Sequence, residues 1–135
     1  MLSKMFAHTS LLQKGLDASW QRNEVISHNL ANVDTPNFKA QRVEFEGEFR
    51  RALEGNAFQA AKTHPGHIDF GTADPLAVSP KIVTDTATSM RMDGNNVDPD
   101  AEMVELAKNT IQYNMLVTKI SKELARLKYA VREGR

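Results

Sequence analysis

The chain has 135 residues, of which 41% are hydrophobic, and its 17 lysines and arginines balance its 17 aspartates and glutamates. This length suits one ordinary domain, and the neutral net charge gives no general attraction to nucleic acid, where neutralised phosphates dominate affinity. The sequence has no cysteine, which excludes disulfides and thiol chemistry, and no apolar run of about 18 residues that would span a bilayer.

The first predicted element is a helix over residues 3–33. Its seam positions follow alternating steps of three and four, the spacing of one packed helix face. Pro36 disfavours helical geometry at Thr35, so the helix should finish near Val33. A second stripe, which includes Ala7, Leu11, Ala18 and Val25, widens the apolar face. The seam positions are Met5, Thr9, Leu12, Leu16, Ser19, Asn23, Ile26, Leu30 and Val33.

The segment from His28 to Lys39 is predicted to organise the exit from this helix. Asparagine is a poor residue inside a helix, because its side chain competes for backbone hydrogen bonds. Two asparagines one turn apart, just before a proline, therefore indicate a structured helix end, after which Phe38 offers an anchor for the departing chain. The candidate residues are Asn29, Leu30, Ala31, Asn32, Thr35, Pro36, Phe38 and Lys39.

Residues 34–97 form a middle arm of different composition, with four of the five prolines and five of the seven glycines. Partial alternation over 42–49 and 81–86 predicts two short strands. So long a stretch with so little periodicity is not expected to form its own domain. We expect an irregular arm with a small β element, ordered mainly by contacts with neighbours.

A second motif, Asp93, Gly94, Asn95, Asn96, Val97 and Asp98, closes the arm. A calcium-binding EF-hand that began at Asp93 would require glycine at position 98 and glutamate at position 104, and the chain has Asp98 and Val104. The motif is therefore interpreted as a turn that delivers the chain to Asp98, a good N-cap for a helix that begins with Pro99.

The last predicted element is a helix over 99–132, roughly 50 Å long at about 1.5 Å per residue. Four heptads of seam positions run along it, and Ala107 and Ile111 lie on a second stripe. Acidic residues near its start and basic residues near its end suit the helix dipole. The seam positions are Met103, Leu106, Thr110, Tyr113, Val117, Ile120, Leu124, Leu127 and Val131.

Two long helices at opposite ends of the chain predict a mainly α fold in which they pair as an antiparallel coiled coil. The expected organisation is an N-terminal helix (1–33), an irregular arm with a small β element (34–97) and a C-terminal helix (98–135). The seam positions should close the pair, and the second stripes (Ala7, Leu11 and Ala18; Ala107 and Ile111) should face other subunits, so self-association is expected.

No enzyme signature accompanies these patterns. The sequence has no phosphate-binding loop, dinucleotide fingerprint or nucleophile elbow. Among the four histidines, His64 and His67 lie three apart in a Pro-Gly turn without a third ligand at a suitable spacing. We therefore expect no catalysis, cofactor or metal.

The motif at the helix exit resembles the signature of the flagellar rod and hook protein family, in which an Asn-Leu-Ala-Asn stretch precedes Thr-Pro, an aromatic residue and a basic residue. Most members have Gly-Tyr after the proline, where this chain has Asn37 and Phe38. Asparagine tolerates left-handed geometry and phenylalanine keeps the ring, so the departure is mild. The second motif is similar to the corresponding element of proximal rod proteins. The resemblance covers about residues 5–45 and 90–132.

This resemblance implies a structural subunit of the proximal rod of the bacterial flagellar basal body, the hollow shaft that transmits torque from the membrane ring to the hook. It implies type III export to the periplasm without a cleaved signal peptide. The implied partners are further rod subunits such as FlgC, the adaptor FliE, and the ring and export gate at the rod base, with no nucleic acid and no membrane insertion. The alternative is a soluble coiled-coil adaptor or secretion chaperone.

Overall fold

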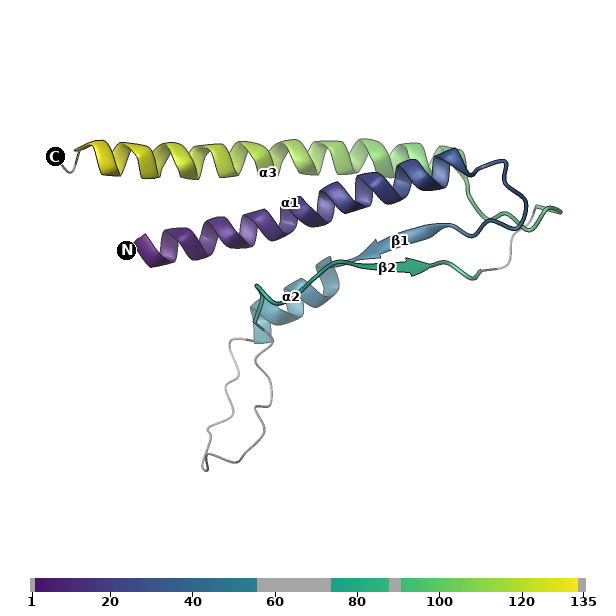
Figure 1. Ribbon diagram of the computed structural model, residues 1–135, viewed down its shortest axis with the longest axis horizontal. Coiled ribbons are helices and arrows are strands. Elements are labelled where there is room, and N and C mark those ends of the chain that lie inside the picture. Colours follow the sequence, from purple (N-terminus) through teal and green to yellow (C-terminus); the bar gives the residue numbers. More distant parts are fainter. Residues whose placement is uncertain (1, 56–73, 88–90, 134–135) are drawn as a thin grey trace, which may run out of the picture.

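The computed structural model describes residues 2–55, 74–87 and 91–133. Its two long helices, α1 (Leu2–Ala31) and α3 (Pro99–Glu133), lie side by side and run in opposite directions, so both ends of the chain lie at the same end of the pair (Figure 1). A two-stranded sheet and a short helix form the arm between them. The predicted mainly α fold with paired terminal helices and a small β element is confirmed.

Close approach between α1 and α3 depends on small and polar residues. The Leu116 side chain lies over Gly15, where an added Cβ would stand 3.5 Å from Leu116 Cδ1. One turn further along α1, the Asn109 side-chain amide donates a 2.8 Å hydrogen bond to the carbonyl of Ser19. Because a polar group at a helix seam is costly unless it is paired, this contact fixes the register of the two helices.

The seam of α3 differs from the predicted one at every second position. Leu106, Tyr113, Ile120 and Leu127 are partly buried, as expected. The alternate positions, however, are Glu102, Asn109, Leu116 and Glu123, each one residue before the predicted member. Met103, Thr110, Val117 and Leu124 are exposed, and so is Val131 near the end of the helix. Hydrophobicity alone favoured these apolar residues over Glu102 and Asn109, which is why the predicted seam was wrong there.

The predicted face of α1 also needs two corrections. Asn23 is exposed, whereas Ala18 and Val25 of the second stripe are buried. Ala18 therefore packs inside this chain and cannot face another subunit, since its side chain is already buried. Ala7 is exposed and Leu11 is partly buried. The side chain of Met5 lies outside the described residues.

The arm folds back along α1, and its two strands form an antiparallel ladder. Strand β1 (Gln41–Glu44) pairs with β2 (Lys81–Thr84), with Val43 opposite Ile82. The strand predicted over 81–86 is confirmed over most of its length. The one predicted over 42–49 is half wrong, because helix α2 (Glu46–Gly55) begins after Phe45. Phe45 and Phe49 stack with ring centroids 4.8 Å apart. The two residues are four apart in the sequence, a spacing that brings side chains together in a helix and that also fits the alternation of a strand.

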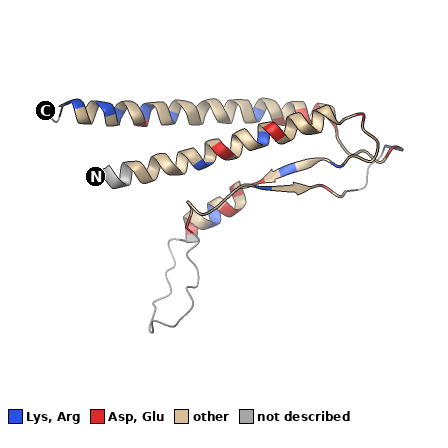
Figure 2. Cartoon of the chain, viewed as in Figure 1, with Lys and Arg blue, Asp and Glu red and all other residues tan. Residues whose placement is uncertain are grey.

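An ion pair joins the arm to the helices. The Arg22 guanidinium of α1 contacts the Glu46 carboxylate at the start of α2. Next to it, a pocket of about 310 Å³ is lined by residues of α1, β1 and the first turns of α3. The acidic start and basic end of α3 are visible along its length (Figure 2).

Candidate functional site

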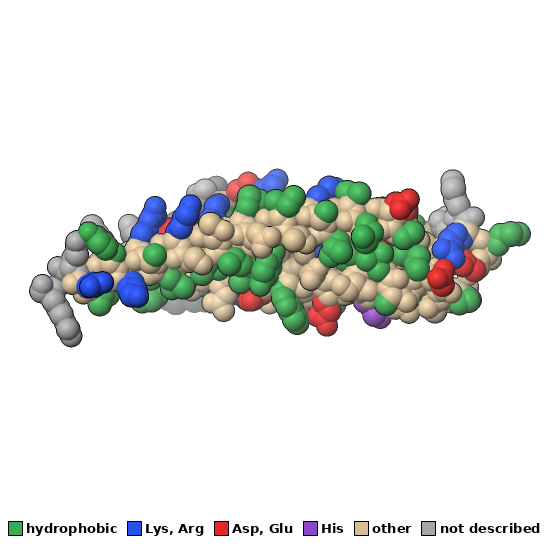
Figure 3. Space-filling model, turned by 90° about the horizontal axis from the view of Figure 1, so that it is seen from above, with side chains coloured by type: hydrophobic (Ala, Val, Ile, Leu, Met, Phe, Trp, Pro, Cys, Tyr) green, Lys and Arg blue, Asp and Glu red, His purple; other side chains and the backbone are tan. Residues whose placement is uncertain are grey.

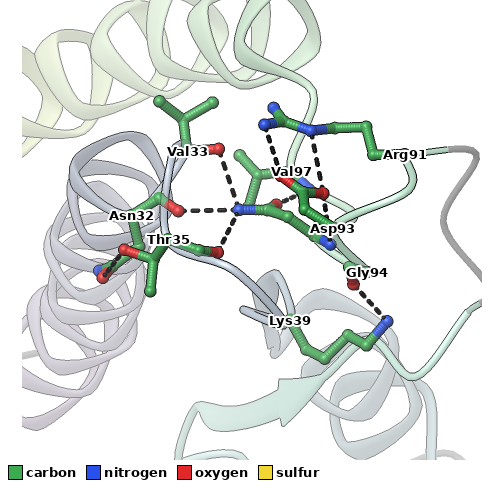
Figure 4. Close-up of polar contacts among 9 residues, drawn as sticks. Asn32, Val33, Thr35, Lys39, Arg91, Asp93, Gly94 and Val97 are labelled. Atoms are coloured by element: carbon green, nitrogen blue, oxygen red, sulfur yellow. Dashed lines mark hydrogen bonds and ion pairs between the residues drawn. The ribbon is translucent and has the colours of Figure 1, made fainter.

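The two sequence motifs, sixty residues apart, meet at one junction where α1 ends and α3 begins. Asn95 of the second motif is fully buried. Its side-chain amide nitrogen lies 2.9 Å from each of the carbonyl oxygens of Asn32, Val33 and Thr35 (Figure 4). An amide has two N–H bonds, so three acceptors share them. Helix ends leave carbonyls without partners, and Asn95 supplies those partners at the end of α1.

The turn that presents Asn95 is held by its own neighbours. The Asn95 side-chain oxygen accepts a 2.8 Å hydrogen bond from the N–H of Val97, and Asp93 Oδ1 accepts one of 3.1 Å from the N–H of Asn95. Arg91 donates to both oxygens of Asp93. These bonds, first from Arg91 and then from the Asn95 N–H, hold the pKa of Asp93 below its ordinary value.

Each motif contributes one residue with left-handed backbone geometry. Asn37 has φ of 61° and Gly94 has φ of 75°. The Asn37 N–H donates 2.8 Å to the carbonyl of Asp93, and Lys39 Nζ donates 2.8 Å to the carbonyl of Gly94. A Cβ on Gly94 would lie 2.7 Å from Asn37 Oδ1, so the Asn37 side chain would have to shift, and the left-handed φ of Gly94 separately favours glycine there.

Asn29 joins the last turns of α1 to the first residue of β1. Its Nδ2 donates 2.8 Å to the carbonyl of Gln41, and its Oδ1 accepts 2.9 Å from the N–H of the same residue. Asn29 is fully buried, so this reciprocal pair satisfies a side chain that otherwise would be costly. The side chain thereby acts as the hydrogen-bonding partner of a strand residue.

Asn96 likewise forms hydrogen bonds with the backbone on either side of the sheet, at the residue before β1 and the residue after β2. Its Oδ1 accepts 2.7 Å from the N–H of Ala40, and its Nδ2 donates 2.9 Å to the carbonyl of Asp85. The Asp85 N–H in turn donates 2.7 Å to the carbonyl of Ala40. The second motif therefore fixes the position of the arm as well as the end of α1.

The second motif ends as predicted, in the cap of α3. Asp98 Oδ1 accepts hydrogen bonds from the N–H groups of Asp100 and Ala101, at 3.0 and 3.4 Å. Val97, immediately before the cap, is buried. One six-residue segment thus ends one long helix, places the arm and begins the other long helix.

The remaining motif residues lie around this junction. Phe38 packs edge-on against the ring of His28, with centroids 5.4 Å apart. Asn32 donates from its side chain to the carbonyl of His28, and its Oδ1 accepts from the Thr35 hydroxyl. Leu30 is partly buried, and Ala31 and Pro36 are exposed.

Of the residues predicted to pack helices, those that lie partly or fully buried in this chain are Leu12, Leu16, Ile26, Leu30, Leu106, Tyr113, Ile120 and Leu127. Met103, Val117 and Leu124 are 56%, 38% and 52% exposed, so they do not pack in the seam with α1.

Several junction residues were not foreseen. Gln41, Ala40 and Asp85 take part through their backbones, which leave no trace in side-chain type. Arg91 belongs to neither predicted motif, although its spacing of two from Asp93 allows the ion pair of 2.8 Å. No local pattern indicates that Asn95 meets residues sixty positions earlier.

The junction offers amide and backbone groups that are already engaged with one another, which suits a rigid joint. Within 2–55, 74–87 and 91–133 no set of three metal-binding side chains occurs. His64 and His67 lie outside the described residues. None of the helices described has the length and apolarity needed to cross a membrane.

Comparison with known proteins gives a consistent family. A family model described as "Flagella basal body rod protein" matches residues 12–39. The chain is 37% identical to the flagellar basal body rod protein FlgB of Bacillus subtilis over 92% of both chains. It is 36% identical to FlgB of Borreliella burgdorferi over 75% of this chain and 78% of that one. It is 27% identical to FlgB of Escherichia coli K12 over 99% of both.

Proposed function

The chain belongs to the FlgB family of flagellar basal body rod proteins and is a structural subunit of that rod, and we propose that it builds the rod's proximal segment by packing α1 and α3 against the helices of neighbouring subunits. Its action in this proposal is mechanical rather than catalytic. The junction of the two motifs holds α1, α3 and the arm in a fixed relation, as a torque-bearing joint requires.

The observation that carries this proposal is the apolar surface that α3 leaves uncovered. One stripe, Met103, Val117 and Leu124, flanks the seam with α1. We call Val104, Ile111 and Met115 the outer face of α3; these side chains are 54%, 62% and 56% exposed. Hydrophobic side chains are spread along the whole length of the molecule (Figure 3).

A single helix with three apolar surfaces is suited to contact several helices at once. The seam with α1 accounts for one of them, and the flanking stripe and the outer face remain for other chains. Among the residues that the structure describes, the buried hydrophobic set is small by comparison, with alanine at three of its seven positions. Burial of exposed leucine, isoleucine or methionine contributes roughly 1.5–3 kcal/mol per side chain, so assembly would supply stability that the single chain lacks.

We propose the neighbours that the family assignment suggests: FlgC and further rod subunits, the adaptor FliE, and the ring and export gate at the rod base, with further copies of the chain itself. The rod would lie in the periplasm, which the subunit would reach by type III export. Support for these finer points comes from membership of the family alone.

The test is recovery of the chain in hook–basal bodies purified from the bacterium that encodes it. The proposal predicts that the chain co-purifies with them and that its deletion stops both rod assembly and swimming. Recovery only in the cytosolic fraction, with normal basal bodies in the deletion strain, would overturn the proposal and favour a soluble adaptor or secretion chaperone.

A further inference from the structure

The pocket of about 310 Å³ between α1, β1 and the first turns of α3 is lined by residues that belong to neither motif. Val25, Ile26 and Val43 form its apolar wall. Glu102 and Glu105 lie on its α3 side, and we call it the Glu102 pocket. A wall with apolar and charged parts suits a long basic side chain, because the aliphatic stem packs while the charged head pairs.

One carboxylate in this wall is buried and has no partner. Glu102 is 5% exposed, and its side chain forms no hydrogen bond or ion pair within the described part of the chain. Asn109 Oδ1 is the only fully buried side-chain atom without a partner among the described residues, so the Glu102 oxygens must keep contact with solvent. They keep it while lining the pocket. A carboxylate drawn away from bulk water is costly unless an opposite charge lies against it.

The other charged groups of the wall already have partners. Two arginines and three glutamates line the pocket, so negative charge exceeds positive charge by one. The existing ion pairs are Arg22 with Glu46, Arg42 with Asp85 at 3.8 Å, and Glu105 with Lys108 at 2.7 Å. The excess charge therefore resides on Glu102, and the occupant that this wall selects is a cation.

From these observations we propose that the Glu102 pocket receives a lysine or arginine side chain from α3 of a second copy of this chain. The charged head pairs with Glu102, and the stem lies on the apolar wall. The donors in the C-terminal half of α3 are exposed and form no ion pair among the described residues: Lys119, Lys122, Lys128 and Arg132. They lie roughly 25–45 Å from Glu102 along one helix, at about 1.5 Å per residue, so none reaches the pocket of its own chain.

The positions of the two surfaces fix the kind of contact. The Glu102 pocket lies at the acidic start of α3, and the unpaired basic side chains lie towards its end (Figure 2). A second copy that inserts a basic side chain must therefore be displaced along the helix axis. Because pocket and donor are different surfaces, the contact repeats without closing, as in a helical assembly. This inference rests on the proposed function, because it names one contact of the rod wall.

The experiment is a double-mutant cycle on the full-length chain. Glu102→Gln removes the charge of the pocket at nearly constant shape. Two donor variants neutralise the basic side chains in pairs: Lys119→Gln with Lys122→Gln, and Lys128→Gln with Arg132→Gln. Each donor variant is also combined with Glu102→Gln, so that coupling between pocket and donor is measured directly.

Matched controls make the same changes of charge at exposed positions elsewhere. Glu24→Gln on α1 matches the pocket variant, and Arg50→Gln with Arg51→Gln on α2 matches the donor variants. Sedimentation over a concentration series measures self-association. Far-UV circular dichroism with urea unfolding of dilute chains checks the fold. Because the Glu102 carboxylate has no partner inside the chain, Glu102→Gln should keep the urea midpoint of the wild type.

We expect Glu102→Gln to weaken self-association about tenfold, and one of the two donor variants to do the same. Both controls should stay within about threefold of the wild type. In the Glu102→Gln background that donor variant should weaken association by less than about a further threefold, because both changes break the same contact.

Four results would each overturn the pocket contact. They are a wild-type chain that stays monomeric over the series, a Glu102→Gln chain that associates normally, donor losses that multiply fully with the loss from Glu102→Gln, and a lowered urea midpoint of Glu102→Gln. The last would show that the partner of this carboxylate lies inside the chain. Recovery in hook–basal bodies alongside any of these results would leave the rod assignment in place.

Discussion

The side-chain amide of Asn95 donates a 2.9 Å hydrogen bond to the backbone carbonyl of Thr35, sixty positions earlier in the chain. The same amide reaches the carbonyls of Asn32 and Val33. The end of α1 is thus capped by a residue of the turn that begins α3, whereas α3 has its own cap in Asp98. The contact between Asn95 and the end of α1 makes the two motifs one structural unit.

Replacement of Asn95 should therefore destabilise the whole chain. Asn95→Ala removes the hydrogen bonds to three part-buried carbonyls and to the Val97 N–H, and we expect the free energy of unfolding to fall by about 2–3 kcal/mol. Asn95→Asp has nearly the same shape but turns an oxygen towards the three carbonyls, so its cost should be at least as large. Urea unfolding followed by circular dichroism measures both. Asn114→Ala, at an exposed position of α3, should change stability by less than about 0.5 kcal/mol, and an equal loss there would contradict the capping role.

The contact between Gly94 and Asn37 predicts a coupled pair of substitutions. Gly94→Ala places a Cβ on a left-handed residue and against Asn37 Oδ1, and it should cost about 1–2 kcal/mol. Asn37→Gly alone removes the colliding side chain and keeps a backbone that tolerates positive φ, so its effect should stay within about 0.5 kcal/mol. In the double variant the cost of Gly94→Ala should fall by about 0.5–1 kcal/mol. Strict additivity of the two substitutions in a double-mutant cycle would rule out the contact.

Asp93 predicts a dependence of stability on pH. Its pKa is lowered in the folded chain, chiefly by Arg91, so its carboxylate binds protons less readily there than in the unfolded chain. This contribution is present above the ordinary aspartate pKa and is lost as pH falls through the folded value, in the range below about pH 4. Unfolding of Asp93→Asn across this range should show a shallower loss of stability than the wild type. Identical pH profiles for the two chains would argue against the Arg91 contact.

Two positions on α3 should separate folding from assembly. Ile120 lies in the seam with α1, and Ile120→Asp should lower the free energy of unfolding by about 2–4 kcal/mol by placing a charge there. Leu124 lies on the flanking stripe, so Leu124→Asp should change monomer stability by less than about 0.5 kcal/mol and still abolish swimming.

Motility in soft agar and urea unfolding measure the two effects, and Ser121→Asp, at an exposed polar position between them, serves as the control. Normal swimming by the Leu124→Asp strain would show that the flanking stripe carries no assembly contact.

The architecture followed from the sequence because each long helix repeats its pattern over many turns. Asp98, Pro99 and the three-four spacing located α3 closely, and Pro36 located the end of α1 within a few residues. The details of the seam did not follow, because several surfaces of α3 are apolar and hydrophobicity cannot say which one meets α1. Asn109 and Glu102 occupy seam positions that a count of apolar residues assigns elsewhere.

The junction was predictable only in part. Asn29 and Asn32 stood out as asparagines inside a predicted helix, where asparagine is unfavourable, and Asp98 was assigned its cap correctly. The pairing of Asn95 with the end of α1, and of Asn96 with Ala40, depends on the path of the arm. Contacts over such separations with backbone groups leave no periodic signal in one sequence, so only the structure reveals them.

The most direct test of the rod assignment is a density map of an intact basal body from the bacterium that encodes the chain. The account predicts that the chain can be traced in the rod wall, with α1 and α3 antiparallel and with Leu124 and the outer face of α3 against helices of neighbouring subunits. A chain traced outside the rod, or an α3 whose flanking stripe and outer face both meet water there, would contradict it.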